Sequence, residues 1–316
     1  MDKTDRLRDY GLAFLLYKQG LSVCGYELIR ELFIFIKLIL NSYLKEKIKM
    51  NPKISVIIPT YNPEDYLWDC LGSLEQQNLS KEYFEVIVVL NGEQEPYFSL
   101  ITERKKNYSF QLKLLYSTQN GVSRARNLGI EQAKGKYVCF LDDDDMISSY
   151  YLQSLLDNAT PNGITEANVI AFIDSNKKTT YHYLSVAYKK YYSFTKHNLV
   201  NHRSFLSSAC CKLIPRDIIA DFRFNENVTH GEDSLFMFQL SYKIKTLNIT
   251  TSNAIYHVRV RKTSASRNSK IKLKKKKMEL KLLFLYTRIF LSKPFAYNFV
   301  LYLTRIAATV RKLIRE

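Results

Sequence analysis

The sequence predicts an α/β protein in which a mostly parallel sheet is flanked by helices, with helical extensions at both ends of the chain. Short, continuous apolar runs recur between residues 54 and 141, and helical patterns separate them. Such runs are typical of strands buried on both faces, and their alternation with helices indicates a doubly wound sheet. The 316 residues correspond to about two domains, or to one large domain with extensions.

Residues 1–50 are expected to form a helical N-terminal extension. We expect two helices there, the second near Glu27–Lys47, because its apolar residues recur at helical spacing. The segments of the sheet follow. The expected strands are Lys53–Thr60, Phe84–Leu90, Leu112–Tyr116 and Tyr137–Leu141, and the expected helices are Pro63–Gln77, Tyr97–Asn107 and Val122–Ala133.

The first strand is expected to end in a turn that opens a helix. Asn62 can cap that helix, Pro63 suits its first position, and Asp65 stands where a capping-box acid would. In open α/β sheets, ligands bind at the carboxyl edge of the strands, so this turn is expected at the ligand-binding edge.

From about Thr160 the pattern is more irregular. The expected pieces are a strand at Asn168–Ile173, a tyrosine-rich stretch at Tyr181–Phe194, a strand that includes Cys210-Cys211-Lys212, a helix at Glu232–Ile244 and a strand at Ala254–Arg261.

Four consecutive aspartates, Asp142 to Asp145, directly follow the apolar strand that ends at Leu141. Their charges repel one another, and a divalent cation bridging to a substrate phosphate would relieve the repulsion. Hard oxygen ligands suit Mg²⁺ or Mn²⁺. A solvated acidic turn is the alternative, but a buried strand that delivers the acids to the ligand-binding edge favours a cation site.

Two further segments are candidates for chemistry. Gly231-Glu232-Asp233 opens an apolar helix, where acids also simply complement the helix dipole. The segment 120–129 reads as a glycine-opened helix that carries Arg124 and Arg126 ahead of the acidic strand. An ordinary helix packed on the sheet is the alternative for this second segment.

Several protein classes are disfavoured. No G-x-G-x-x-G motif occurs, which argues against a dehydrogenase, and the glycines before Lys136 lack the spacing and context of a phosphate loop. The five cysteines form no Cys-x-x-Cys pair, which argues against a disulfide framework and a structural zinc site. Acidic residues replace the basic start of a secretory signal, and no terminal apolar run is long enough to span a membrane, so we expect a cytoplasmic protein.

The net charge of +17 is concentrated near the C-terminus. Residues 259–316 hold 17 of the 47 Lys and Arg residues but only two of the 30 acids. The remainder is nearly neutral, whereas a nucleic-acid enzyme more often spreads basic charge around its groove. We therefore expect no nucleic-acid partner for the body of the protein.

Residues 268–316 are expected to form a basic amphipathic helical tail. Its polybasic run and apolar stripe predict docking on an anionic membrane face, with Arg305 among the charges available to headgroups. Packing of the stripe on the protein itself, or on a second subunit, is the alternative. The stripe consists of Phe299, Leu303, Ile306, Val310 and Leu313.

Taken in order, five segments resemble the inverting glycosyltransferases of family 2, which have the Rossmann-like glycosyltransferase A-type fold. The resemblance spans roughly residues 53–267. It implies a catalytic domain at residues 51–267, with a nucleotide-sugar half at 51–158 and an acceptor half at 159–267. The matching segments are Val56–Asn62, Glu85–Gly92, Gly121–Gly129, Gly135–Asp145 and Gly231–Asp233.

The resemblance also implies a set of residues that bind the donor. Pro59 and Tyr61 would line the nucleoside pocket, and Asp142 would face the ribose or the metal. Arg126 and Asp143 join them as candidate donor-binding residues.

Asn91 stands where the family commonly has an acid that reads the edge of uracil. An asparagine oxygen can still accept the uracil imino proton, so we expect a UDP-sugar.

The metal and the base are implied in the same way. Asp144, the third residue of an Asp-x-Asp signature, would be the principal ligand of Mn²⁺ or Mg²⁺, with Asp142 beside it. Some relatives use a histidine near His257 on the metal, and a solvated histidine is the alternative. Asp233 matches the catalytic base, with Glu232 beside it.

The resemblance therefore implies a metal-dependent inverting glycosyltransferase acting on a hydroxyl of a glycan or lipid-linked acceptor. We expect it to work in bacterial surface polysaccharide synthesis, at the inner face of the cell membrane. One alternative is a polyprenyl-phosphate sugar synthase, whose phosphate nucleophile needs no base. The other is a nucleic-acid-binding protein that uses the lysine-rich tail. The oligomeric state is not assigned.

Overall fold

A computed structural model of the protein describes residues 33–34, 37, 52–194, 197–261 and 272–315. The chain divides into two compact units, residues 1–51 and 52–316. In the first unit Phe33, Ile34 and Lys37 are helical, and the rest of the expected N-terminal helices lies outside the described residues.

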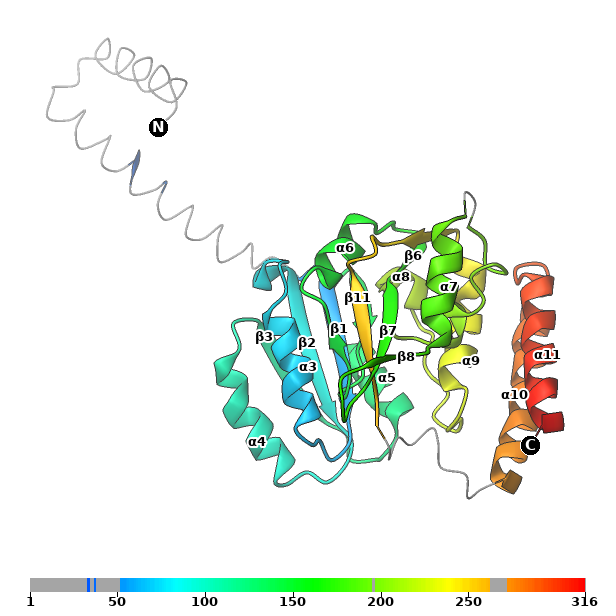
Figure 1. Ribbon diagram of the computed structural model, residues 1–316, viewed down its shortest axis with the longest axis horizontal. Coiled ribbons are helices and arrows are strands. Elements are labelled where there is room, and N and C mark those ends of the chain that lie inside the picture. Colours follow the sequence, from blue (N-terminus) through cyan, green and yellow to red (C-terminus); the bar gives the residue numbers. More distant parts are fainter. Residues whose placement is uncertain (1–32, 35–36, 38–51, 195–196, 262–271, 316) are drawn as a thin grey trace, which may run out of the picture. The chain divides into compact units, whose positions relative to one another are not determined.

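The second unit is built on a seven-stranded sheet (Figure 1). The strands β1, β2, β3 and β4 run parallel in the order β4-β1-β2-β3, and β9 pairs antiparallel with both β4 and β6. The mostly parallel sheet expected from the sequence is therefore confirmed. Its strands are β1 (Ile54–Thr60), β2 (Phe84–Leu90), β3 (Gln111–Tyr116), β4 (Tyr137–Phe140), β6 (Gly163–Glu166), β9 (Lys212–Pro215) and β10 (Thr246–Ile249).

Helices flank this sheet. Every residue of β1 and β2 is buried, because α5 packs on both strands from one side. A Cβ on Gly129 of α5 would lie 2.4 Å from Cγ2 of Ile57, so glycine permits this close approach. The helices that precede α9 are α3 (Tyr66–Glu75), α4 (Tyr97–Arg104), α5 (Val122–Gln132), α6 (Tyr151–Asp157), α7 (Tyr183–Tyr192) and α8 (Arg216–Ile219).

A second, four-stranded sheet has the order β5-β11-β7-β8. It consists of β5 (Met146–Ile147), β11 (Ile255–Val260), β7 (Asn168–Ile173) and β8 (Thr179–Thr180). Met146 pairs with His257, so the segment that follows the four aspartates is tied directly to β11. This sheet therefore places β11 next to the four aspartates.

Three helices complete the unit: α9 (Glu232–Leu240), α10 (Lys272–Ser292) and α11 (Phe299–Arg315). Figure 1 shows α10 and α11 side by side, and α10 contacts α9. Leu282, Tyr286 and Leu301 are buried in the common core. One face of the basic tail therefore packs on the protein.

Two local expectations are wrong. Helix α3 begins at Tyr66 rather than at Pro63, and Asn62 does not cap it, because Asn62 adopts a positive φ of 45° and accepts the Glu93 amide through Oδ1. Strand β9 begins at Lys212 rather than at Cys210, because Cys211 has a φ of 65°, outside the extended range, and Cys210 forms only an isolated bridge with Phe140. The described cysteines are buried and unpaired. Within the described ranges, no helix is long and apolar enough to cross a membrane.

Candidate active site

The carboxyl ends of β1, β2 and β4 meet at one edge of the sheet. Thr60 pairs with Leu90 across β1 and β2, and the amide of Asn91 donates to the carbonyl of Thr60 at 2.9 Å. Phe140 pairs with Ile57, which sets Asp142 beyond the same edge. The parallel register alone thus brings three of the predicted segments together, as expected for a ligand site in an open α/β sheet.

Each of the four aspartates has a different partner. Thr60 Oγ1 donates to Asp143 Oδ2 at 2.5 Å, and Arg261 forms an ion pair with Asp144 at 2.7 Å. The amide of Arg259 donates to Asp145 at 2.8 Å. Asp142 is held by Arg126, described below. The carboxylates are consequently spread around the end of β4 rather than stacked on one another.

Burial and mutual repulsion raise the pKa of several of these carboxyls. The pKa of Asp143 rises to about 7, mainly through burial, with the Thr60 hydrogen bond opposing the rise. Burial, and then the Asp142 charge, raise the pKa of Asp144, and burial raises that of Asp145 strongly. The cluster is therefore short of positive charge, which a bound cation would supply.

The donor set suits a hard divalent cation, but not as a complete protein cage. Among the described residues no three His, Cys, Asp or Glu side chains gather as ligands, so Asp142, Asp144 and His257 do not form a closed set. Mg²⁺ is commonly held by one or two carboxylates together with substrate phosphates and water. Asp142 and Asp144 fit that pattern, while the ligand role of His257 stays a prediction. Burial lowers the pKa of His257.

Arg126 links the acidic cluster to the start of α9. Its side chain is 4% exposed, and its guanidinium lies 2.9 Å from Asp142 Oδ1 and 2.6 Å from Asp233 Oδ1. Glu232 lies 3.8 Å away. The sequence placed Arg126 with the donor; its bridging position follows from the fold, which joins α5, β4 and α9 at this point.

Asp233 is fixed at the first turn of α9 by two donors. Arg126 holds one carboxylate oxygen, and the amide of Ala209 donates to the other at 3.0 Å. Gly231 precedes the helix with a φ of +81°, a conformation that favours glycine. Burial, followed by the charge of Asp233, raises the pKa of Glu232.

The predicted nucleoside residues occupy contrasting positions. Pro59 is buried within β1, and Tyr61, just beyond the strand, is 57% exposed. Asn91 is 4% exposed; its Nδ2 donates to the Thr60 carbonyl and its Oδ1 accepts the Gly121 amide at 3.2 Å. Asn91 thus ties the ends of β1 and β2 to the start of α5, and its contact with a base stays a prediction.

Two residues of the site were not identified from the sequence. The hydroxyl of Tyr256 accepts the amide of Asp142 at 3.1 Å and so fixes the first aspartate. Arg259, buried in the second sheet, donates to the Asp144 carbonyl and forms ion pairs with Asp69 and Asp174.

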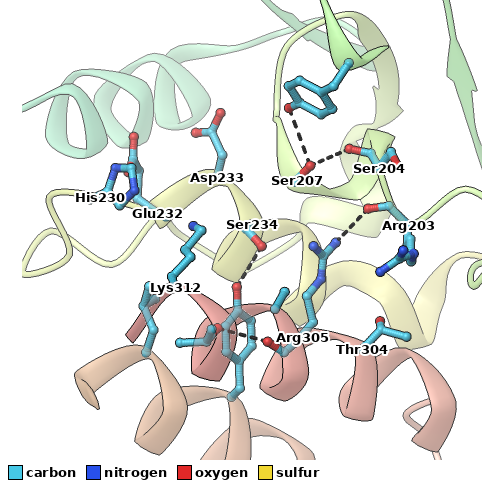
Figure 2. Close-up of a pocket in the computed structure, with 16 residues that line it drawn as sticks. Arg203, Ser204, Ser207, His230, Glu232, Asp233, Ser234, Thr304, Arg305 and Lys312 are labelled. Atoms are coloured by element: carbon cyan, nitrogen blue, oxygen red, sulfur yellow. Dashed lines mark hydrogen bonds between the residues drawn. The ribbon is translucent and has the colours of Figure 1, made fainter. Parts of the chain in front are cut away.

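A cavity of about 560 Å³ opens beside Asp233. Its walls come from the start of α9, the turn at residues 203–207, and helices α10 and α11. Figure 2 shows Asp233 and Glu232 near one part of this cavity and Arg305 near another, with Ser234 between them. The cavity is large enough for a sugar-sized group next to a carboxylate.

Comparison with known proteins gives the same outline. The model of a family described as "Glycosyl transferase family 2" matches residues 55–223, more than half of the chain. The chain is 28% identical over 218 residues to the minor teichoic acid biosynthesis protein GgaB of Bacillus subtilis, covering 68% of this chain and 24% of GgaB. It is 26% identical over 223 residues to the poly(ribitol-phosphate) beta-N-acetylglucosaminyltransferase TarS of Staphylococcus aureus, covering 66% of this chain and 36% of TarS. The chain thus spans about a quarter of the length of GgaB and a little over a third of that of TarS.

Two solved structures share the fold. TarS residues 1–349 in complex with UDP-GlcNAc superpose with a TM-score of 0.61 at 22% identity, over 75% of this chain and 66% of that one. The mannosyltransferase PcManGT of Pyrobaculum calidifontis, in complex with GDP-Man and Mn²⁺, gives a TM-score of 0.52 at 15% identity, over 84% of this chain and 76% of that one.

Proposed function

Since this chain belongs to glycosyl transferase family 2, we propose that it transfers a sugar from a UDP-sugar to a hydroxyl group of a cell-surface glycan or lipid-linked acceptor, with inversion at the anomeric carbon. The observation that carries the proposal is the position of Arg126. One buried guanidinium contacts Asp142, at the predicted donor site, and Asp233, at the predicted base. The donor site and the base that acts on the acceptor would then both lie in contact with the Arg126 side chain.

The two predicted carboxylate roles divide between the two sides of Arg126. Asp233 would accept the proton of the acceptor hydroxyl as that hydroxyl attacks the anomeric carbon. Asp144 and Asp142 would hold a Mn²⁺ or Mg²⁺ ion, which when bound stabilises negative charge on the departing diphosphate. Arg126 would hold the Asp233 carboxylate in place until the acceptor arrives.

The same placement supports the proposed division of the catalytic domain into a donor half and an acceptor half. Residues 51–158 supply Pro59, Tyr61 and the acidic cluster, and we assign the donor to them. Residues 159–267 supply Asp233 and part of the neighbouring cavity, and we assign the acceptor to them, with α10 and α11 closing the cavity.

The choice of UDP rests on relatives and on Asn91. TarS is solved with UDP-GlcNAc, and the Oδ1 of Asn91 retains a second lone pair beyond the one engaged by Gly121. The names of GgaB and TarS support an acceptor in teichoic acid or a related surface polymer.

The tail is proposed to dock the enzyme on an anionic membrane face. The outer surface of the α10–α11 pair leaves apolar side chains exposed beside basic ones, including Lys276, Lys277 and Lys281. The expectation that Arg305 contacts lipid headgroups is wrong, because Arg305 is 8% exposed and lines the cavity. The exposed apolar residues are Leu280, Phe284, Leu291, Phe295, Phe299, Val300, Leu303, Val310 and Ile314.

A panel of nucleotides with Mn²⁺ tests the proposed function. Calorimetry on the full chain is expected to show UDP binding more than about tenfold tighter than GDP or CDP, a difference of about 1.4 kcal/mol. UDP-sugars should also raise the melting temperature and undergo slow hydrolysis. Equal or tighter binding of GDP would refute the assignment of uracil, and no nucleotide binding at all would refute the proposed function.

A further inference from the structure

We propose that the cavity beside Asp233 binds a phosphate group of the acceptor through Arg305, so that the acceptor is a phosphate-bearing molecule. This inference rests on the proposed function, because it names the acceptor class for the same site. The phosphate would belong either to a repeating unit of a polyol-phosphate polymer or to the diphosphate of a lipid carrier.

Arg305 lies on α11 with its guanidinium in the wall of the cavity (Figure 2). The residue is 8% exposed. One amino group donates to the carbonyl of Arg203 at 3.1 Å, while Nε has no hydrogen-bond partner among the described residues. A buried guanidinium that lines a cavity, has one hydrogen bond to a carbonyl and leaves an N–H group without a partner among the described residues is suited to an anionic ligand.

The contrast with the other buried arginines supports this reading. Arg126 contacts two aspartates at 2.6 and 2.9 Å, and Arg259 contacts two at 2.7 and 2.8 Å. Arg305 forms no ion pair with any described carboxylate. Burying a charge without a counterion is costly, so an anion in the cavity would supply the partner that the protein chain does not.

The neighbouring charges point to the same ligand. Arg203 also lines the cavity. Burial of Arg305 lowers its pKa, and the positive charge of Arg203 lowers it further. Lys312, two turns further along α11, also lines the cavity, and its Nζ lies 3.7 Å from Glu279 Oε1. Two guanidiniums that repel each other are stabilised together by one phosphate, which accepts bidentate hydrogen bonds from arginine.

The geometry of the cavity gives the phosphate a role in positioning. Figure 2 shows Ser234, with its hydroxyl 2.7 Å from that of Tyr286, between the carboxylates and Arg305. A phosphate at Arg305 would therefore lie away from the acids and leave an adjoining hydroxyl of the acceptor near Asp233. This arrangement also avoids repulsion between the phosphate and Asp233.

The test is thermal stabilisation of the full chain by phosphate compounds at constant ionic strength. UDP with Mn²⁺ is present throughout, so that the donor site is filled. Inorganic phosphate in excess of its dissociation constant should raise the melting temperature by about 1–3 °C. Arg305→Gln should lose this rise, because it keeps the shape and a donor but removes the charge. Arg311→Gln, an exposed change on the same helix, should keep it.

Two further arms identify the source of the phosphate. Glycerol phosphate represents a polyol-phosphate unit, and geranyl diphosphate represents a lipid diphosphate. The compound with the larger Arg305-dependent shift identifies the acceptor type.

Equal stabilisation of Arg305→Gln and the wild type by all three compounds would overturn the inference, as would no stabilisation of the wild type. Circular dichroism of Arg305→Gln checks that the variant folds. UDP binding by the wild type, measured first, separates this failure from failure of the proposed function.

Discussion

Arg126 and Asp233 are 107 positions apart in the chain, yet their side chains meet at 2.6 Å. Because Arg126 also contacts Asp142, removal of either carboxylate leaves a buried guanidinium partly uncompensated. Variants at this junction should therefore conserve shape and hydrogen bonding, so that loss of chemistry is not confused with loss of structure.

The first prediction concerns the base. Asp233→Asn should lower kcat by about 10²–10⁴, the usual contribution of a positioned general base, while UDP affinity changes little. Steady-state kinetics and calorimetry on one preparation measure both. Asp217→Asn, an exposed change in α8, is the control. A variant with weakened UDP binding and normal kcat would assign Asp233 to the donor, and full activity would favour the polyprenyl-phosphate sugar synthase.

The second prediction concerns the metal. Asp144→Ala should lower kcat at least about 10²-fold, since a metal supplies several kcal/mol of transition-state stabilisation. The fold should survive, because Asp144 lies in a cluster of like charges that repel one another. Wild-type protein in EDTA should lose activity and regain it with Mn²⁺. Full activity in EDTA would rule out the predicted metal, and Glu131→Ala, distant from the cluster, serves as the control.

The third prediction concerns the membrane. Full-length protein should sediment with phosphatidylglycerol vesicles at low salt and be released as salt screens the attraction. The triple change of Lys276, Lys277 and Lys281 to Ala should weaken this binding about 10²-fold, since each basic residue near the surface contributes about 1 kcal/mol.

Two controls make the membrane test specific. The matching triple change of Lys105, Lys106 and Lys134, which are exposed elsewhere, should leave binding unchanged. Phe284→Ser removes an exposed apolar group. Its loss of vesicle binding should be larger at high salt than at low salt. Wild-type protein that ignores anionic vesicles at low salt would refute docking.

The fourth prediction concerns stability. Glu166 and His202 are fully buried and lie 2.6 Å apart, and His202 contacts His197 at 2.8 Å through its other ring nitrogen. Glu166→Ala should lower the free energy of unfolding by about 3–5 kcal/mol, because it leaves the buried imidazole of His202 without its carboxylate partner. Urea denaturation measures the loss. Glu131→Ala, an exposed partner of Arg223 at 3.8 Å, should cost less than about 1 kcal/mol. Similar losses for both would contradict the prediction.

The central strands and the acidic edge of the sheet could be predicted from local sequence patterns. Strands β2 and β7 have the predicted bounds, because a continuous run of mostly apolar residues forms each of them, and β2 is buried along its whole length. The acids after β4 could be placed at the ligand-binding edge, because they directly follow a strand of a parallel sheet and so lie at its carboxyl end. Both inferences use information local to a dozen residues.

The pairing of charged groups could not be predicted in this way, because it depends on how distant segments fold together. Contacts between segments more than 100 residues apart bring Arg126 to Asp233 and Arg261 to Asp144. They also place Arg305, which forms no ion pair with a described carboxylate, in the cavity wall beside Arg203. Helical spacing placed Arg305 on an amphipathic helix, but it could not tell which side of that helix the catalytic body would cover. The burial of a charge is a property of the assembled fold, and the sequence pattern of one helix does not contain it.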